Sequence, residues 1–187
     1  GGEHTLTLGA VEALGEKTTV ICFDAHLDLR DEYLGQRITH ATFMRRICES
    51  IGPENVTVVG VRAVSKEEMK FAEESGVNII DMMELRRSGI KKCGETLKKF
   101  VHDHDEIYIS IDMDVLDPSI APAVQTPEPE GLLLHELLNL LTEGCTRKPK
   151  ALDLVEVTPV YDNGITSIHA AKIIFETLCL LETLPEK

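Results

Sequence analysis

Two segments of this 187-residue chain carry carboxylate and imidazole side chains at alternate positions, an arrangement typical of metal ligands. The first, DAHLDLRD, covers residues 24–31, and the second, SIDMDVLDP, covers residues 110–118. Alternate side chains of an extended chain point to the same side, and acidic groups gathered there repel one another strongly unless a cation lies between them. The pattern therefore predicts a metal site and favours one with two ions. The candidate ligands are Asp24, His26, Asp28, Asp112 and Asp114.

The types of these residues narrow the choice of metal and of reaction. Carboxylates and imidazole without a thiolate favour ions such as Mn²⁺, Mg²⁺, Fe²⁺ or Co²⁺ over structural Zn²⁺. Two such ions, held about 3.5–4 Å apart by shared carboxylates, lower the pKa of a bound water by several units from about 15.7. Hydrolysis is therefore the reaction class that the two segments indicate.

Each ligand segment follows a short apolar run rich in Val and Ile, which is typical of a strand buried on both faces of a parallel sheet. Strands are predicted at residues 18–23, 56–61, 77–81, 107–111 and 151–157. Helices are predicted at residues 41–50, 65–74, 83–101, 132–144 and 167–184. This alternation predicts a single α/β domain over residues 1–187, a three-layer sandwich with a mostly parallel sheet.

The helix predicted at residues 65–74 has the clearest end signals. Ser65 is a candidate N-cap, and Glu68 stands three residues later, which is the spacing of a capping box. Gly76 is the candidate stop before the next strand.

A third strand is expected to place an acidic residue beside the two ligand segments. In open α/β sheets, ligands bind beyond the carboxyl ends of the strands. Both ligand segments begin at such ends, and Glu156, in DLVEVTP, is expected at the end of the strand over 151–157. We therefore expect three strands to deliver acidic groups to the same edge of the sheet.

The overall composition limits the kinds of partner. A net charge of −13 and a pI near 4.9 argue against nucleic acid and against an anionic membrane surface, and are compatible with a cationic substrate or simply with solubility. No apolar run reaches the roughly 18 residues of a transmembrane helix. The five cysteines are scattered without a CxxC pair, which is typical of reduced core residues and favours a cytoplasmic location.

These motifs resemble those of the ureohydrolase family, which includes arginase, agmatinase and their relatives. The resemblance rests on GGEH (residues 1–4), DAHLDLRD (24–31), THATFMRR (39–46), SIDMDVLDPSIAP (110–122) and VEVTPVYD (155–162). They follow the family's order across nearly the whole chain. The DEY after Arg30 and the ATFMRR sequence resemble the agmatinase branch more than arginase. The resemblance implies an arginase-like sandwich.

The resemblance also implies a role for each matching residue. Two Mn²⁺ ions would be held by six ligands: His4, Asp24, Asp28 and Asp112 for one ion, and His26, Asp24, Asp112 and Asp114 for the other. Glu156 matches the acid that pairs with a guanidinium group, whose planar fork suits a carboxylate. His40 matches a histidine that carries protons to the leaving amine.

The activity implied is that of a hydrolase acting on C–N bonds of linear amidines, with agmatine, cleaved to urea and putrescine in polyamine biosynthesis, as the leading substrate. Another family hydrolase is an alternative: arginase, guanidinobutyrase or formiminoglutamase. A metal-binding subunit without turnover is a second alternative. The resemblance also implies a homotrimer or homohexamer.

The chain departs from the family pattern in three places. Family members ordinarily carry about one hundred residues before the GGEH motif, so the fold is expected to lack its N-terminal part. In the loop after Asp117, the residues Ala123, Gln125 and Glu130 replace glycines of the family, and Ala41 replaces a glycine beside His40. Loop glycines usually supply positive φ or close approach to a ligand, so the shape of the substrate mouth is expected to differ.

Overall fold

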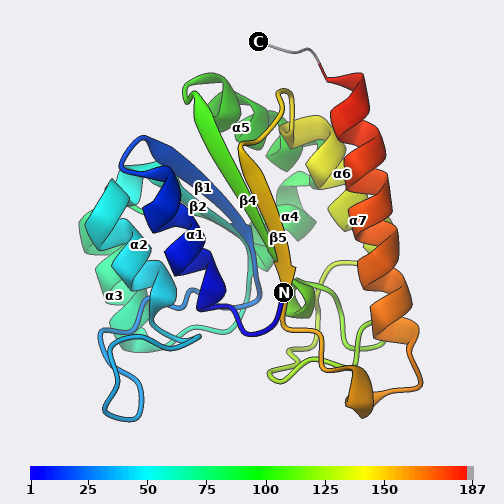
Figure 1. The fold of residues 1–187 in the computed structure, drawn as a ribbon, viewed down its shortest axis with the longest axis horizontal. Coiled ribbons are helices and arrows are strands. Elements are labelled where there is room, and N and C mark those ends of the chain that lie inside the picture. Colours follow the sequence, from blue (N-terminus) through cyan, green and yellow to red (C-terminus); the bar gives the residue numbers. More distant parts are fainter. Residues whose placement is uncertain (185–187) are drawn as a thin grey trace.

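Five β-strands form one parallel sheet within residues 1–184, the part of the chain that the computed structural model describes (Figure 1). The strand order is β3-β2-β1-β4-β5, and each neighbouring pair is parallel. The strands are β1 Thr18–Phe23, β2 Val56–Val61, β3 Asn78–Asp81, β4 Glu106–Asp112 and β5 Ala151–Val155. The parallel sheet predicted from the sequence is confirmed.

Helices cover both faces of the sheet, so the three-layer sandwich is also confirmed (Figure 1). On one face lie α1 Leu6–Leu14, α2 Phe43–Ile51 and α3 Lys66–Ser75. On the other lie α4 Met82–Ser88, α5 Ile90–His102, α6 Leu134–Gly144 and α7 Ile165–Thr183. Within residues 1–184, no helix combines the length and apolar character needed to cross a bilayer.

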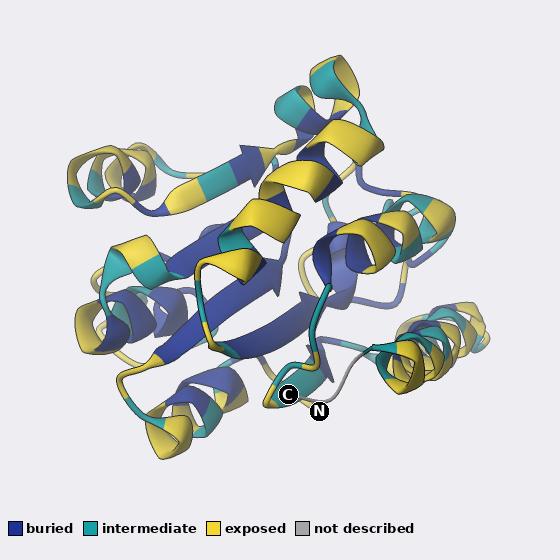
Figure 2. Cartoon of the chain, turned by 90° about the horizontal axis from the view of Figure 1, so that it is seen from above, coloured by how far each residue is buried: buried dark blue, intermediate teal, exposed yellow. Residues whose placement is uncertain are grey.

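Burial of both faces explains why the strands read as continuous apolar runs. Every residue of β1 and of β2 is buried. Figure 2 shows the central strands buried between helices whose inner sides are buried and whose outer sides are exposed. Side chains of one strand therefore enter two separate cores: Val20 packs with α1 and α2, whereas Ile21 packs with the helices of the other face.

The predicted elements match observed ones to within two residues at each end, and three differences have an identifiable cause. Residues 83–101 form two helices, because Gly89 adopts a φ of 86° and ends α4 before α5 begins. The last predicted strand ends at Val155, because Glu156 turns the chain with a φ of 65°. Helix α1 lies outside the predicted helices; Thr7 and Gly9 lower the helix propensity there, and burial of Leu8 and Val11 stabilises it instead.

The capping box predicted for α3 is confirmed. The Ser65 hydroxyl accepts from the Glu68 backbone at 3.3 Å, and the Ser65 backbone donates to Glu68 Oε2 at 2.9 Å. Gly76 ends the helix in the left-handed conformation, with φ 84° and ψ 24°. Glu68 Oε1 also accepts from the Leu29 backbone at 3.2 Å, so the capping box ties α3 to the first ligand segment.

Replacing Ser65 by Ala tests this cap. We expect the free energy of unfolding in urea to fall by about 1 kcal/mol, because the backbone N–H of Glu68 loses its acceptor. Ser50 is the matched control, since it is an exposed residue inside α2 and its replacement by Ala should change stability by less than about 0.5 kcal/mol. Equal losses for the two variants would contradict a specific capping role.

Candidate metal centre

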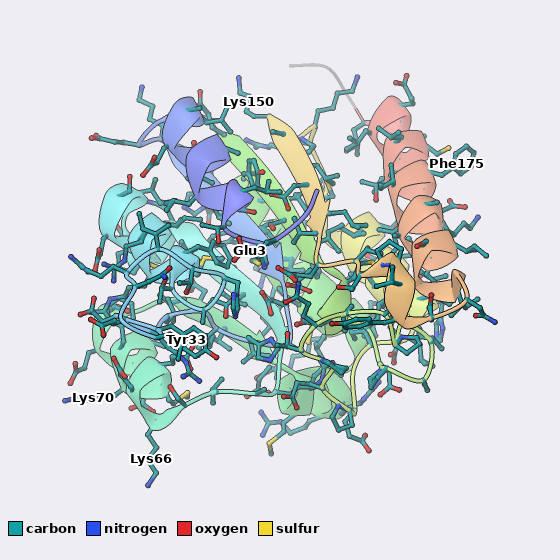
Figure 3. All side chains as sticks on the ribbon, turned by 60° about the horizontal axis from the view of Figure 1, so that its bottom comes forward. Glu3, Tyr33, Lys66, Lys70, Lys150 and Phe175 are labelled. Carbon is teal, nitrogen blue, oxygen red and sulfur yellow. The ribbon has the colours of Figure 1, made fainter. Side chains whose placement is uncertain are left out.

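A cavity of about 380 Å³ opens at the carboxyl ends of β1, β4 and β5. Its walls include seven of the eight candidate site residues: His4, His26, Asp28, His40, Asp112, Asp114 and Glu156. The eighth, Asp24, is buried and contacts His4 and His26. The strand ends that form this edge face the viewer in Figure 3, where Glu3 and Tyr33 are labelled near the cavity. The structure thus brings together all eight residues at one edge.

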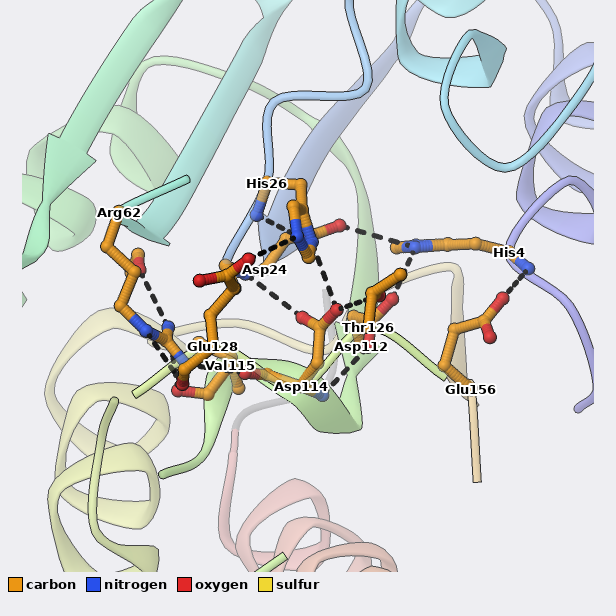
Figure 4. A network of polar contacts seen from close by, with 12 residues as sticks. His4, Asp24, His26, Arg62, Asp112, Asp114, Val115, Thr126, Glu128 and Glu156 are labelled. Atoms are coloured by element: carbon orange, nitrogen blue, oxygen red, sulfur yellow. Dashed lines mark hydrogen bonds and ion pairs between the residues drawn. The ribbon is translucent and has the colours of Figure 1, made fainter. Parts of the chain in front are cut away.

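Asp24 lies between two histidines, each of which also faces a second carboxylate (Figure 4). His4 Nδ1 lies 3.3 Å from Asp24 Oδ2 and 3.0 Å from Asp112 Oδ2. His26 Nδ1 lies 3.5 Å from Asp24 Oδ1 and 3.0 Å from Asp114 Oδ2. The carboxylate of Asp24 therefore directs one oxygen to each histidine, as a ligand shared by two ions would.

The local backbone differs from the extended chain used to predict these ligands. Only Asp112 lies in a strand, because residues 113–115 form a 3-10 turn that carries Asp114. Asp112 Oδ1 accepts from the Asp114 backbone at 2.8 Å, and this bond holds both carboxylates against the cavity. In the first segment, the strand ends at Phe23 and Asp28 adopts a left-handed φ of 51°. The side chains therefore converge on one cavity, but turns and hydrogen bonds bring them there instead of alternation along an extended segment.

Asp28 is set apart from the other five candidate ligands. It lines the cavity, but among the described residues no hydrogen bond or ion pair joins its carboxylate to them. Burial, and next the negative charge of Asp24, raise the pKa of Asp28 well above its usual value. Its place in the ligand set stays a prediction.

The pKa values of four groups in the cluster are raised, which favours bound protons: Asp28, Asp112, His4 and His26. Burial, together with the charges of Asp114 and Asp24, raises the pKa of Asp112 well above its usual value. Burial lowers the pKa of His26, but bonds to Asp114 and Asp24 outweigh it and raise the pKa to about 11. The electrostatics of the site therefore favour added positive charge, which protons supply in the absence of a metal ion.

One buried atom fits the metal hypothesis directly. His4 Nδ1 is buried and has no hydrogen-bond partner of acceptable geometry, although it faces two carboxylate oxygens at 3.0 and 3.3 Å. Adjacent ligand atoms, each about 2.1 Å from an octahedral ion, lie about 3 Å apart. The oxygen and imidazole donors also suit Mn²⁺ and similar ions. The residues present therefore fit a divalent metal ion.

Glu156 and His40 differ in their exposure to solvent. Glu156 is 9% exposed, and its Oε1 accepts from the His4 backbone at 2.8 Å. Burial raises the pKa of Glu156, although the bond from His4 opposes the shift. The side chain of His40 is 42% exposed; its Nδ1 lies 3.4 Å from Glu3 Oε1, and its ring packs edge-on against Tyr33 at 5.5 Å. The cavity thus has a buried acid in its wall and an accessible imidazole at its mouth.

Three further residues support the cluster and were not singled out from the sequence. Thr126 donates to Asp114 Oδ2 at 3.0 Å, and Cys22 Sγ lies 3.7 Å from His4 Nε2. Arg62 donates to the backbone oxygens of Asp114 and Glu128, at 2.7 and 2.8 Å (Figure 4). Only Cys22 carried a signal, since it stands two positions before Asp24. The other contacts join segments far apart in the chain.

In the loop after Asp117, one of the three residues that stand where family glycines were expected has a positive φ. Glu130 adopts a left-handed φ of 65°, whereas Ala123 and Gln125 do not have positive φ. Gln125 instead lines the cavity as an exposed side chain. The loop therefore changes the lining of the mouth, and one residue retains the backbone conformation that favours glycine.

Comparison with known proteins gives consistent matches along the chain. The sequence model of the Arginase family matches residues 1–179. The agmatinase of Bacillus subtilis is 39% identical over 184 residues, which cover 95% of this chain and 61% of that protein. The agmatine ureohydrolase of Thermoplasma volcanium superposes with a TM-score of 0.89 at 37% identity, covering 97% of this chain and 61% of that one. The formimidoylglutamase of B. subtilis gives 0.90 at 30% identity, with 100% and 61% covered.

The raised pKa of His26 predicts that a metal ion must displace protons. The imidazole holds its proton below about pH 11, so at neutral pH binding of Mn²⁺ should release about one proton or more per chain. The apparent affinity should therefore rise with pH. Calorimetry in two buffers of different ionisation enthalpy measures this release.

A matched pair of histidine variants locates the released proton. His26→Gln should reduce the release by about one proton, whereas His135→Gln, an exposed residue of α6, should leave it unchanged. Identical heats for the wild-type protein in both buffers would contradict proton displacement.

Proposed function

This chain belongs to the arginase family, and we propose that its site hydrolyses a guanidino compound to urea and an amine with the help of two divalent metal ions. The observation that carries the proposal is the convergence of two histidines and three aspartates on one cavity whose wall contains Glu156. The chain spans about 61% of the length of the agmatinase it matches.

The metal ions are proposed to be Mn²⁺. One would be held by His4, Asp24, Asp28 and Asp112, and the other by His26, Asp24, Asp112 and Asp114. Bound divalent ions supply a water of lowered pKa and polarise the group under attack. The donor set and the partnerless Nδ1 of His4 support this assignment.

Glu156 is proposed to bind the guanidinium group of the substrate. A carboxylate matches the planar fork of a guanidinium, and a pairing of this kind is strongest where water is excluded. Burial of Glu156 meets that condition, and its bond from the His4 backbone fixes Oε1 beside the first histidine. The substrate carbon would thus be held next to the metal ligands.

His40 is proposed to deliver the proton that the leaving amine requires. Its imidazole lines the cavity and is accessible to solvent, so it can exchange protons between bulk water and a bound substrate. Glu3 lies 3.4 Å from Nδ1 and orients the ring.

Agmatine is the proposed substrate among the guanidino compounds. Agmatinases are among the relatives that match this chain, and the cavity has acidic side chains at its rim. Glu128 lines the cavity and its side chain is 40% exposed, whereas Glu3, 43% exposed, lies outside the lining at 3.4 Å from His40. Their charges favour a cationic tail over a carboxylate tail. A formimidoylglutamase is a structural relative at 30% identity, so hydrolysis of a different linear amidine is the second candidate.

Assembly and location are proposed by analogy with the family. We propose a homotrimer or homohexamer in the cytoplasm. The cysteines support a reducing compartment, since none of the five forms a disulfide and four are buried.

A substrate panel tests the proposed reaction. The protein, loaded with Mn²⁺, should release urea from agmatine with a kcat/KM at least about tenfold higher than from arginine, guanidinobutyrate or guanidinopropionate, because the rim charges disfavour a carboxylate. Formimidoylglutamate is assayed for formamide. Absence of turnover on all five compounds, with two ions bound per chain, would leave only a metal-binding subunit.

Replacing Glu156 by Gln separates substrate binding from metal binding. Turnover of the guanidino substrate should fall about 100-fold in kcat/KM, because a charge-assisted pair of about 1.5–3 kcal/mol is lost. Metal content, measured by elemental analysis, should stay unchanged. Glu67→Gln, on the exposed side of α3, is the matched control and should retain full activity. Normal turnover by the Glu156 variant would exclude its proposed role.

A further inference from the structure

The carboxylate of Asp153 on β5 accepts hydrogen bonds from three hydroxyl groups close to the proposed metal ligands. Ser110 Oγ on β4 donates to Asp153 Oδ1 at 2.7 Å. Thr7 Oγ1 on α1 and Tyr108 OH on β4 donate to the other oxygen, Oδ2, at 2.6 and 2.5 Å. None of these four residues is in the ligand set. They form a polar network between α1 and the sheet.

Ser110 connects this network to the first metal histidine. His4 Nε2 lies 2.8 Å from Ser110 Oγ, on the side of the ring away from Asp24 and Asp112. The His4 ring is fully buried and stacks on Phe43 with a centroid distance of 4.2 Å. The ring therefore contacts Ser110 with one nitrogen and the candidate metal position with the other.

The direction of each hydrogen bond follows from the number of protons available. A carboxylate only accepts, so each hydroxyl gives its single proton to Asp153. With its proton committed, the Ser110 oxygen can only accept from His4 Nε2. When a metal ion replaces the second proton, the ring is neutral, and the proton on Nε2 leaves the Nδ1 lone pair for the ion. That lone pair faces Asp24 and Asp112, at the atom that has no hydrogen-bond partner.

We propose that Asp153 is a positioning residue that acts through Ser110 to hold the Nδ1 lone pair of His4 toward a metal ion. The inference rests on the proposed metal site and adds the device that selects the histidine tautomer. Hydrogen bonds of this kind to the second nitrogen of a metal-bound histidine fix the ring and raise its basicity. Cys22 is a weaker partner for the same nitrogen, because its sulfur lies 3.7 Å away.

Removal of the carboxylate releases the Ser110 hydroxyl. In Asp153→Ala the Ser110 proton is free to point at His4 Nε2, which favours a proton on Nδ1 and opposes metal binding. We expect the dissociation constant for Zn²⁺, a diamagnetic probe ion, to rise about 10–100-fold by chelator competition. Ser110→Ala should give a loss of the same size, since it removes the acceptor for Nε2–H.

The double variant tests whether Asp153 acts through Ser110. Asp153→Ala combined with Ser110→Ala should bind Zn²⁺ no more weakly than Ser110→Ala alone, because the path to His4 is already broken. Tyr108→Phe is the matched control: it removes one of the donors to Asp153 but leaves the bond to Ser110, so Zn²⁺ affinity should change less than about threefold. Losses that add in the double variant would overturn the proposal.

A nitrogen-15 spectrum of the histidine rings gives a readout independent of activity and affinity. In wild-type protein with Zn²⁺, His4 should carry its proton on Nε2 and its metal shift on Nδ1, with assignment from His4→Gln. A His4 without a proton on Nε2, or unchanged Zn²⁺ affinity of Asp153→Ala, would overturn the proposal.

The same spectrum separates this proposal from the proposed function. If wild-type protein takes up no Zn²⁺ or Mn²⁺, the metal site itself fails. The protein without metal still tests whether Asp153 acts on His4 through Ser110. An Nε2 proton that exchanges slowly with solvent in wild type and faster in Asp153→Ala supports the chain, and equal exchange overturns it.

Discussion

The burial of several neighbouring carboxylates is the constraint on which the rest of the structure depends. Asp24, Asp112 and Asp114 are buried within a few ångströms of His4 and His26. Isolated, each buried carboxylate would be very unfavourable, and the mutual repulsion of three would add to that. The raised pKa of Asp112 and of His26 expresses the same constraint, because both shifts increase the positive charge of the site. The fold is stable around this cluster only with a cation or with bound protons.

The parallel sheet meets the constraint by supplying rigid positions and backbone donors. The acids follow strands that are hydrogen-bonded to one another, since β1 pairs with β4 and β4 with β5. Backbone N–H groups then fix individual oxygens: His26 donates to Asp24 at 2.7 Å, and Ala25 donates to Asp114 at 3.1 Å. Each acid thereby has one oxygen held by the scaffold and another directed at a histidine.

Local sequence patterns predicted the parts of the fold and site that depend on local physics. Buried strands read as apolar runs, so β1 and β2 were placed with their observed bounds, and the ligand segments followed from their position after such runs. Helix α1 was missed because tertiary packing, rather than propensity, stabilises it. The support from Arg62 was missed for a related reason: it reaches Asp114 from 52 residues away.

The loop after Asp117 and the buried cluster depend on different interactions. A change at Gln125 or Glu130 leaves the charge balance of the buried cluster unaffected, because both side chains are exposed to solvent. The proposed metal ligands, in contrast, are linked by short contacts in which the loss of one partner leaves a buried charge without compensation. Thr126 joins the two regions, since it belongs to the loop and donates to Asp114. The loop thus adds one side-chain hydrogen bond to a cluster whose geometry backbone donors also hold.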